Sequence, residues 1–383
     1  MNGILTDEQA MIQDMARQFS QDNLAPSAAA REAAGHIDQD IIAQMGALGF
    51  LGMTVPEELG GVGADYVSYA LALMEIAAGD GAVSTMMSVH NAPFCAILQR
   101  FASPEQQKRW LAPAAQGAFI GCFALTEPHT GTDAAALKAR AQRTKDGYEL
   151  NGAKQFISSA RIGGATIAFA VTDPAAGKKG ISAFYIEQNN PGLIVAEPEK
   201  KMGQKASDTC ALTFDDLQIE AEALIGKEGQ GLSIALSSLE AGRIGIASQS
   251  VGMAQAALEY ATAYALERTA FGKPIFDHQA VAFRLADMDA QIEASRQLVL
   301  NAARLKDLGQ PCLREASIAK LTASQMAERV VSDAIQTLGG YGYLADYPLE
   351  RIYRDVRVCQ IYEGTSDVQR INISRDLKRK FSS

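Results

Sequence analysis

The sequence predicts an α+β fold: an N-terminal all-α domain, a middle antiparallel β domain and a C-terminal helix bundle. Amphipathic segments with helix caps fill about the first 115 residues, short apolar runs between tight-turn dipeptides follow, and long helical periodicities return after Gly229. A chain of 383 residues exceeds one ordinary core. We therefore expect three domains, over residues 1–120, 121–228 and 229–383.

Helix-start signals mark the N-terminal part. Thr6 with Gln9, and Ser103 with Gln106, have the spacing of capping boxes. The glycine-rich stretch 56–63 resembles a nucleotide-binding fingerprint but lacks the strand that precedes one, so we interpret it as a turn. The first domain should therefore be helical throughout.

Tight-turn dipeptides and β-rich runs mark the middle part. Asp146-Gly147 and Asn151-Gly152 predict turns, and runs such as 166–171 predict strands. No segment of crossover-helix length separates these runs, which argues against a parallel doubly wound sheet.

Apolar residues at intervals of three and four predict long helices in the C-terminal part, over 232–260, 281–299 and 318–338. Long helices with short connections form a bundle. Gly242 and Gly252 weaken the first of these helices, so close contact with neighbouring helices must compensate.

Two more helices should flank a short bridge near the end of the chain. Asp346 can cap the first of them, which we expect to end near Tyr362, and Ser366 with Gln369 has the spacing of a capping box for the second.

Glu363 lies on this bridge and is the candidate general base. A carboxylate held among apolar neighbours has a raised pKa, closer to the range useful for proton abstraction. The commoner interpretation of a single loop glutamate is a solvated side chain. The sequence around it alone leaves both open.

Composition limits the classes of partner. A net charge of −9 and a pI near 5.1 argue against nucleic acid or an anionic membrane as the main partner.

No uncharged apolar stretch is long enough to span a membrane, and the first residues carry neither a basic segment nor an apolar run, so we expect no leader. Five dispersed cysteines and four histidines suggest neither disulfides nor a metal site. We expect a reducing, cytoplasmic compartment.

Four segments, in chain order, resemble those of the acyl-CoA dehydrogenase family. They are Ala124-Leu125-Thr126-Glu127-Pro128-His129-Thr130-Gly131-Thr132-Asp133, Arg268-Thr269-Ala270-Phe271-Gly272, Gln336-Thr337-Leu338-Gly339-Gly340-Tyr341-Gly342-Tyr343 and Tyr362-Glu363-Gly364-Thr365-Ser366. The resemblance runs from about Leu5 to Leu377. It implies FAD-dependent α,β-dehydrogenation of an acyl-CoA, an electron-transfer flavoprotein as electron acceptor, and a homo-oligomer, in this family usually a homotetramer.

The resemblance also implies roles for individual residues. Glu363 would be the catalytic base. FAD would be bound by Phe123, Leu125, Thr126, Gly131, Thr132, Phe156, Ile157, Ser158, Arg268, Phe271, Gln279, Gln336, Gly339, Gly340, Thr365 and Asp367. The CoA substrate would be bound by Thr132, Glu240, Arg243, Tyr362 and Gly364.

The residues by themselves have plainer interpretations. Phe156 would be a core strand residue, Arg268 a solvated arginine, and Glu240 with Arg243 a surface ion pair on one helix face. Gln336 to Gly340 would be a helix C-cap, and the loop from Thr126 to Asp133 an ordinary turn.

The chain departs from the family pattern at a few positions. Thr130 stands where Gly, Ala or Ser is usual, Thr132 where Ser is usual, and Phe156 where Trp is commoner. Both threonines keep the polarity of the site. Gly242 occupies the position at which one relative carries its catalytic glutamate, which is consistent with a single base at Glu363.

Segments 206–210, 240–247 and 339–343 are similar to those of the butyryl-, isobutyryl- and 2-methylbutyryl-CoA members. The resemblance therefore implies a substrate of about four or five carbons, in a pocket that rejects longer chains. Two alternatives are a flavin oxidase or monooxygenase on the same scaffold and a non-enzymatic helical interaction protein. Retention of Glu363 speaks against the monooxygenase.

Overall fold

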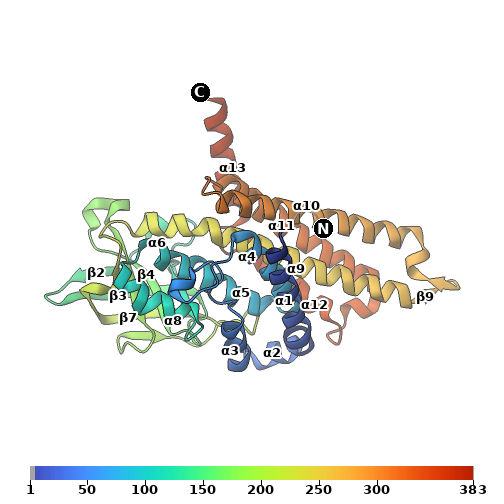
Figure 1. Ribbon diagram of the computed structural model, residues 1–383, viewed down its shortest axis with the longest axis horizontal. Helices are drawn as coiled ribbons and strands as arrows, with labels where there is room; N and C mark the ends of the chain where they lie inside the picture. Colours follow the sequence, from blue (N-terminus) through green and yellow to red (C-terminus); the bar gives the residue numbers. More distant parts are fainter. Residues whose placement is uncertain (1–4, 383) are drawn as a thin grey trace.

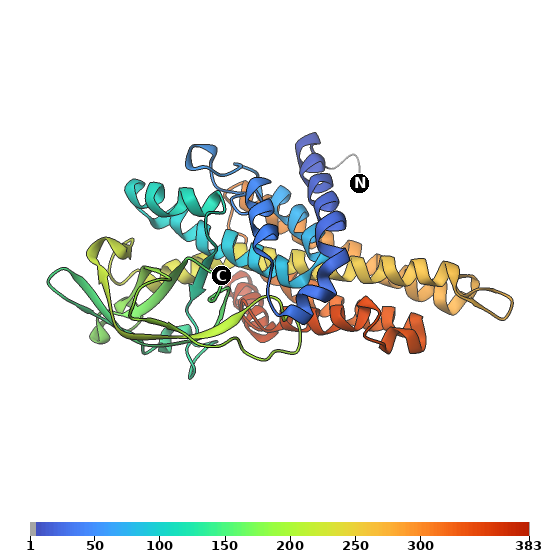
Figure 2. The ribbon, with the colours of Figure 1, turned by 90° about the horizontal axis from the view of Figure 1, so that it is seen from below.

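The structure, a computed structural model, describes residues 5–382. Residues 1–4 and residue 383 lie outside the described range. The expectation that the chain has no leader concerns the first residues, so part of it lies outside this range. A large sheet lies at one end of the molecule, with helices of the N-terminal part and one long helix beside it, and a long helix bundle extends away from it (Figures 1 and 2). The predicted α+β class is confirmed.

Helices form the whole of the first part of the chain. They are Asp7–Phe19 (α1), Ala28–Ala34 (α2), Gln39–Ala47 (α3), Tyr66–Gly79 (α4), Gly81–Val89 (α5), Ala96–Phe101 (α6), Pro104–Gln106 (α7) and Ala112–Ala115 (α8). Both predicted capping boxes are present, at Thr6 with Gln9 and at Ser103 with Gln106. A wider helical turn, His90–Cys95, kinks at Ala92 before Pro93 and leads into α6.

The middle part forms an eight-stranded sheet in the order β6-β7-β3-β2-β4-β5-β8, with β1 beside β4. The strands are Gly121–Ala124 (β1), Arg140–Arg143 (β2), Gly147–Ser158 (β3), Ala165–Val171 (β4), Ile181–Glu187 (β5), Leu193–Val195 (β6), Thr209–Glu220 (β7) and Leu224–Ile225 (β8). Most pairs are antiparallel, as predicted. Two pairings depart from the predicted antiparallel arrangement: β1 runs parallel to β4, and β2 also meets β4 in parallel at Arg140 and Val171.

One predicted turn is wrong. Asn151-Gly152 lies inside β3, where the register against β7 shifts between Leu150 and Gly152. Gly152 has φ 142°, and a Cβ there would lie 2.7 Å from the Cα of Ala139. The dipeptide therefore forms a bulge that lets the chain pass closely, not a hairpin turn.

The C-terminal part consists of long helices with short connections. They are Gly231–Glu267 (α9), Gln279–Asp307 (α10), Leu313–Leu338 (α11), Pro348–Val356 (α12) and Ser366–Phe381 (α13). A small hairpin, Thr269–Ala270 (β9) with Lys273–Pro274 (β10), joins α9 to α10. The expected close contact on α9 is present, since a Cβ at Gly252 would lie 2.0 Å from the carbonyl oxygen of Met74 on α4.

The helix ends near Glu363 differ from the prediction in three ways. Tyr347, not Asp346, is the N-cap of α12, which ends at Val356 and continues only as a short 3₁₀ turn, Arg357–Gln360. Thr365, not Ser366, caps α13, because its hydroxyl accepts from the N–H of Val368. The bridge that carries Glu363 is therefore residues 361–365.

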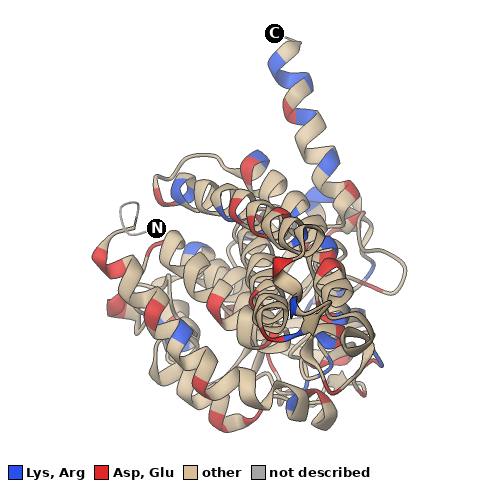
Figure 3. Ribbon diagram, turned by 90° about the vertical axis from the view of Figure 1, so that its right-hand side faces the viewer, with Lys and Arg blue, Asp and Glu red and all other residues tan. Residues whose placement is uncertain are grey.

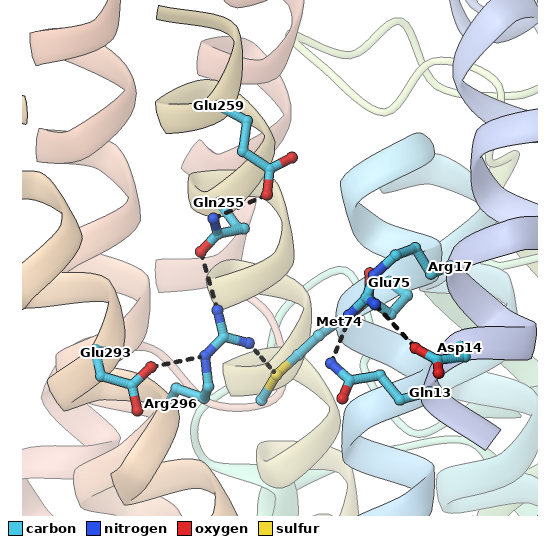
Figure 4. A network of polar contacts seen from close by, with 9 residues as sticks. All are labelled: Gln13, Asp14, Arg17, Met74, Glu75, Gln255, Glu259, Glu293 and Arg296. Carbon is cyan, nitrogen blue, oxygen red and sulfur yellow. Dashed lines mark hydrogen bonds and ion pairs between the residues drawn. The ribbon is translucent and has the colours of Figure 1, made fainter. Parts of the chain in front are cut away.

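Apolar cores join the three parts. One core combines α4 with α9, α10 and α11, and another packs the sheet against α6, α8 and the start of α9. Polar contacts also link α1, α4, α9 and α10: Gln13 donates to Glu75, and Arg296 donates to both Gln255 and the sulfur of Met74 (Figure 4). Helix α9, about 55 Å long for its 37 residues, thus runs from the sheet through the bundle.

Charges of both signs are spread over the helices, and the end of α13 is basic (Figure 3). Among residues 5–382, no helix has the length and apolar character needed to cross a membrane.

Candidate active site

Glu363 has an unusual backbone conformation. Its φ is 54° and that of Gly364 is 85°, so two consecutive residues adopt the left-handed region. For glutamate this conformation is strained, and such strain concentrates at functional sites. Buried polar side chains hold the turn: Lys320 Nζ donates to the Gly364 carbonyl at 2.7 Å, and Gln369 Nε2 donates to the same carbonyl at 2.8 Å.

The Glu363 carboxylate lies directly against helix α9. A Cβ built on Gly242 would be 2.6 Å from Glu363 Oε2 and 3.1 Å from Oε1. No side chain can therefore stand at position 242 while the carboxylate keeps this place. Gly242, which stands at the position where one relative carries its catalytic glutamate, is thus the residue against which the Glu363 carboxylate lies.

Burial sets the electrostatics of the site. It raises the pKa of Glu363 to about 7, while the nearby charges of Arg243 and Lys320 act in the opposite direction. Burial also lowers the pKa of Lys320 to about 8 and lowers that of Arg243. A carboxylate with a pKa near neutral pH can both accept and return a proton at that pH.

Two of these charged groups, Glu363 and Arg243, have buried atoms without a hydrogen bond among the described residues. Glu363 Oε2 and the Nε and Nη1 atoms of Arg243 are buried, and none has a partner within the described part of the chain. Leaving such groups unpaired costs about 1–3 kcal/mol each, or more when they are charged. The expected Glu240–Arg243 ion pair does not form, because Glu240 lies instead 3.9 Å from Lys306. Unpaired donors and acceptors in one buried place indicate a binding site for a polar ligand.

Phe156 does not belong to the core. It has φ 60° at a second register shift of β3, between Lys154 and Ile157, and its side chain is 64% exposed. An aromatic ring presented at a strained bulge is available for stacking with a ligand. Its neighbours are placed as strand residues, with Ile157 buried and Ser158 half-buried.

The loop after β1 lies beside this bulge, because the Gln155 N–H donates to the Thr126 carbonyl at 2.9 Å. Glu127 anchors the loop by a buried ion pair with Lys154 at 2.8 Å. Leu125 is buried, Phe123 and Thr126 are half-buried, and the tip of the loop at Gly131 and Thr132 is exposed. Two of the segments that the resemblance assigned to FAD are thus adjacent in space.

A pocket of about 530 Å³ lies where α9, α11 and the 3₁₀ turn that follows α11, Gly339–Tyr343, meet. Its lining contains Arg268, Gln336, Gly339 and Gly340, four of the residues that the resemblance assigned to FAD. A Cβ at either glycine would meet no described atom within 4 Å, so the backbone is open to a ligand. Phe271 and Gln279 do not line this pocket.

The remaining residues lie at element ends. Phe271, 97% exposed with φ 52°, forms the tip of the β9–β10 hairpin, and Gln279 begins α10. Thr365 caps α13, and Asp367 in its first turn pairs with Arg370 at 2.8 Å.

Comparison with known proteins decides the family. Descriptions of the N-terminal, middle and C-terminal domains of acyl-CoA dehydrogenases match residues 6–118, 122–217 and 229–378. An acyl-CoA dehydrogenase of Bacillus subtilis (strain 168) is 44% identical over 373 residues, 97% of this chain and 98% of that protein. The chain belongs to the acyl-CoA dehydrogenase family.

Other members of the family are similarly related. The human mitochondrial short-chain specific acyl-CoA dehydrogenase is 43% identical over 99% of this chain and 92% of its own length. The solved butyryl-CoA dehydrogenase from Megasphaera elsdenii has a TM-score of 0.96 at 40% identity, covering 98% of this chain and all (100%) of that one.

Two more solved structures share the fold. One, described as the electron transferring flavoprotein of Acidaminococcus fermentans, contains a chain with a TM-score of 0.97 and 44% identity, covering 99% of this chain and 100% of that chain. A glutaryl-CoA dehydrogenase from Mycobacterium smegmatis in complex with FADH2 has a TM-score of 0.94 at 30% identity, over 99% and 96% of the two chains.

Sequence reasoning missed the polar side chains that support Glu363. Lys320 is fully buried on α11 between Ala316 and Ala323, and a lysine on an otherwise apolar helix face was a readable signal. Gln369 was assigned only a capping role. Gln249 and Gln204, which contact the Tyr362 hydroxyl, gave no local signal because they come from other parts of the chain.

Proposed function

We propose that this member of the acyl-CoA dehydrogenase family converts a short-chain or short branched-chain acyl-CoA to the 2-enoyl-CoA, with FAD as cofactor. The observation that carries the proposal is the Glu363 carboxylate. It is buried and without a hydrogen bond to Oε2 among residues 5–382, it rests on Gly242, and it has a pKa of about 7.

Glu363 removes the proton from the α-carbon of the thioester. Near neutral pH about half of the Glu363 side chains are ionised, which suits a group that must take up a proton during each turnover. The charge that develops on the thioester oxygen needs a donor. The N–H of Glu363 itself makes no hydrogen bond with another described residue and is proposed as one such donor.

FAD fits the residues present. The exposed Phe156 ring and the neighbouring loop offer a stacking surface and hydroxyls, and the pocket beside Arg268 offers cationic and backbone groups for phosphate and adenosine. These residues would hold FAD, which when bound would supply the acceptor for the hydride that leaves the β-carbon. We assign its binding to Phe123, Leu125, Thr126, Gly131, Thr132, Phe156, Ile157, Ser158, Arg268, Phe271, Gln279, Gln336, Gly339, Gly340, Thr365 and Asp367.

The CoA thioester is assigned to Thr132, Glu240, Arg243, Tyr362 and Gly364. The unpaired Nε and Nη1 of Arg243, buried near the base, support this assignment for arginine most strongly. The short acyl chain is supported by the similarity to short-chain specific and butyryl-CoA dehydrogenases.

We further propose a homotetramer that passes electrons to an electron-transfer flavoprotein in the cytoplasm. Large apolar side chains are exposed at the far end of the bundle and on α13, among them Phe271, Phe283, Tyr343 and Phe381, as expected of surfaces that a second copy covers. Helix α13 projects away from the rest of the chain (Figure 1). We place the domain boundaries at residues 120/121 and 228/229.

The chain-length profile tests the function. With FAD-loaded protein and a dye as electron acceptor, kcat/KM should be highest for butyryl-, isobutyryl- or 2-methylbutyryl-CoA and lower for octanoyl- and palmitoyl-CoA. A pocket gains about 1–3 kcal/mol for each methylene that it accommodates and loses affinity once overfilled. A maximum at octanoyl- or palmitoyl-CoA would contradict the short-chain assignment alone, and no turnover of any of the five would contradict the dehydrogenase assignment.

A further inference from the structure

A buried polar network surrounds the hydroxyl of Tyr362, the residue before the proposed base. This hydroxyl donates to Gln249 Oε1 on α9, and it lies 3.4 Å from both Thr85 Oγ1 on α5 and Gln204 Nε2. Gln249 Nε2 in turn donates to Thr85 Oγ1 at 2.6 Å and to the Gly81 carbonyl at 2.9 Å. The Tyr362 side chain is therefore fixed from the N-terminal helices, from α9 and from the segment between β6 and β7.

Of the residues just named, only Gln204 belongs to the middle part of the chain. It lies between β6 and β7, in a segment without helix or strand, and is 5% exposed with φ 48°. Its amide oxygen accepts from Thr85 Oγ1 at 2.5 Å, and its Nε2 donates to the Asp355 carbonyl at 3.2 Å. Its backbone N–H donates to the Asp355 carboxylate. Gln204 is therefore buried and strained, and its polar groups form hydrogen bonds with other residues. These hydrogen bonds connect α5, α12 and residue 362.

The turn 362–364 thus has two supports. Lys320 and Gln369 hold the carbonyls of Gly364 and Glu363 from the side of the bundle. The Tyr362 network holds the residue before Glu363 from α5, from α9 and from the segment between β6 and β7. Since the left-handed conformation of Glu363 follows directly on Tyr362, loosening the phenol would free the carboxylate to leave its place on Gly242.

We propose that Gln204 is a positioning residue for Glu363, acting through the Tyr362 hydroxyl, so that the placement of the base depends on docking of the β6–β7 segment. The inference rests on the proposed function, because it takes Glu363 as the base. The two are separable: substitution of Glu363 tests the chemistry, and substitution of Gln204 leaves Glu363 in place and tests its positioning.

The charged and titratable groups that face Glu363 come from three helices: Arg243 of α9, Lys320 of α11 and Tyr69 of α4. Burial between them raises the pKa of Glu363 to about 7. A carboxylate that spends time outside this place is better hydrated, and its pKa moves toward the ordinary value of about 4.3.

The test is Gln204→Met, which keeps the length of the side chain and removes its hydrogen bonds. We expect unchanged flavin content, a fall of about 10- to 100-fold in the rate of flavin reduction by butyryl-CoA, and a KM within about 3-fold of wild type, as for a displaced catalytic group. The midpoint of the pH profile for flavin reduction should fall by about half a pH unit or more.

Two comparisons make the test specific. Gln13 is a matched control: it is 7% exposed, and its Nε2 donates to Glu75 at 2.7 Å, in the network of Figure 4. Gln13→Met should leave the reduction rate and the pH midpoint unchanged. Tyr362→Phe removes the same hydroxyl contact without altering the segment between β6 and β7, residues 196–208, and it replaces Gln204→Met if that variant does not fold.

The double variant Gln204→Met/Tyr362→Phe should be no slower than the slower single variant, because both act through one hydroxyl. The inference is overturned if both single variants reduce flavin within about 2-fold of wild type, if their pH midpoints equal that of wild type, or if the two effects multiply in the double variant.

Discussion

The pKa of Glu363 is the residue-level property with the most direct consequence. A general base acts when deprotonated, so the rate of flavin reduction by butyryl-CoA should rise with pH and level off above a midpoint near 7. Stopped-flow measurements from pH 5 to pH 9 would give this midpoint. A rate that is already constant from pH 5 upward would show that the carboxylate is not held in the buried position.

The same pKa has a consequence for stability. Because the folded pKa of about 7 exceeds the unfolded value of about 4.3, folding is favoured less as pH rises from about 4 through 7. Glu363→Gln removes this dependence. The variant should therefore have a higher Tm than wild type at pH 8 and a smaller advantage at pH 5.

A single methyl group added at position 242 tests where the Glu363 carboxylate lies. Gly242→Ala would place a Cβ 2.6 Å from Glu363 Oε2, so we expect a fall in kcat of about 10- to 100-fold. Alanine is the better helix former by about 1 kcal/mol, so the free energy of unfolding should not fall comparably. Activity within about 2-fold of wild type would count against the placement of the carboxylate on α9.

At the scale of elements, the C-terminus of α9 is predicted to hold the cofactor. Arg268 lines the pocket beside Gly339 and Gly340, with its guanidinium over the Tyr341 ring at 5.8 Å. Arg268→Ala should lower the FAD content after gel filtration, because a guanidinium is suited to a pyrophosphate. Arg143, whose guanidinium lies 5.2 Å from the Tyr148 ring at the sheet, is the matched control. Equal FAD content in both alanine variants would remove Arg268 from the cofactor site.

Local signals predicted some elements and not others. The capping boxes at Thr6 and Ser103 are satisfied within four residues, so the sequence alone revealed them. Asn151-Gly152 has the composition of a turn, but pairing of β3 with β7 on one side and β2 on the other keeps it within a strand. The pairing of β3 with its two neighbouring strands, and not the local sequence, therefore decides the structure of residues 151–152.

The candidate site shows the same division. The segments that carry Glu363, Phe156 and Arg268 were found by their motifs, because each motif is contiguous. The hydrogen bonds to the residues beside Glu363 come from Lys320, which donates to the Gly364 carbonyl, and from Gln249, which accepts from the Tyr362 hydroxyl. Both partners are remote in sequence, so only the folded chain brings them together.

At the scale of the whole molecule, exposed apolar surface predicts assembly. Phe271, Phe283 and Tyr343 are exposed on the long bundle, and Phe381 is exposed on the projecting helix α13. We expect light scattering to give four times the chain mass of 40.8 kDa. Deletion of residues 371–382 should shift the mass toward smaller species. A monomeric full-length protein would contradict the assembly.

The measurement that tests the central proposal most directly is anaerobic flavin reduction by butyryl-CoA in wild type and in Glu363→Gln. Both proteins should bind FAD, because the amide has nearly the shape of the carboxylate. Wild type should lose its visible flavin absorption on mixing, whereas Glu363→Gln should be reduced about 10²- to 10⁴-fold more slowly or not at all. Reduction of the Glu363→Gln flavin at a rate near that of wild type would contradict the assignment of Glu363 as the base.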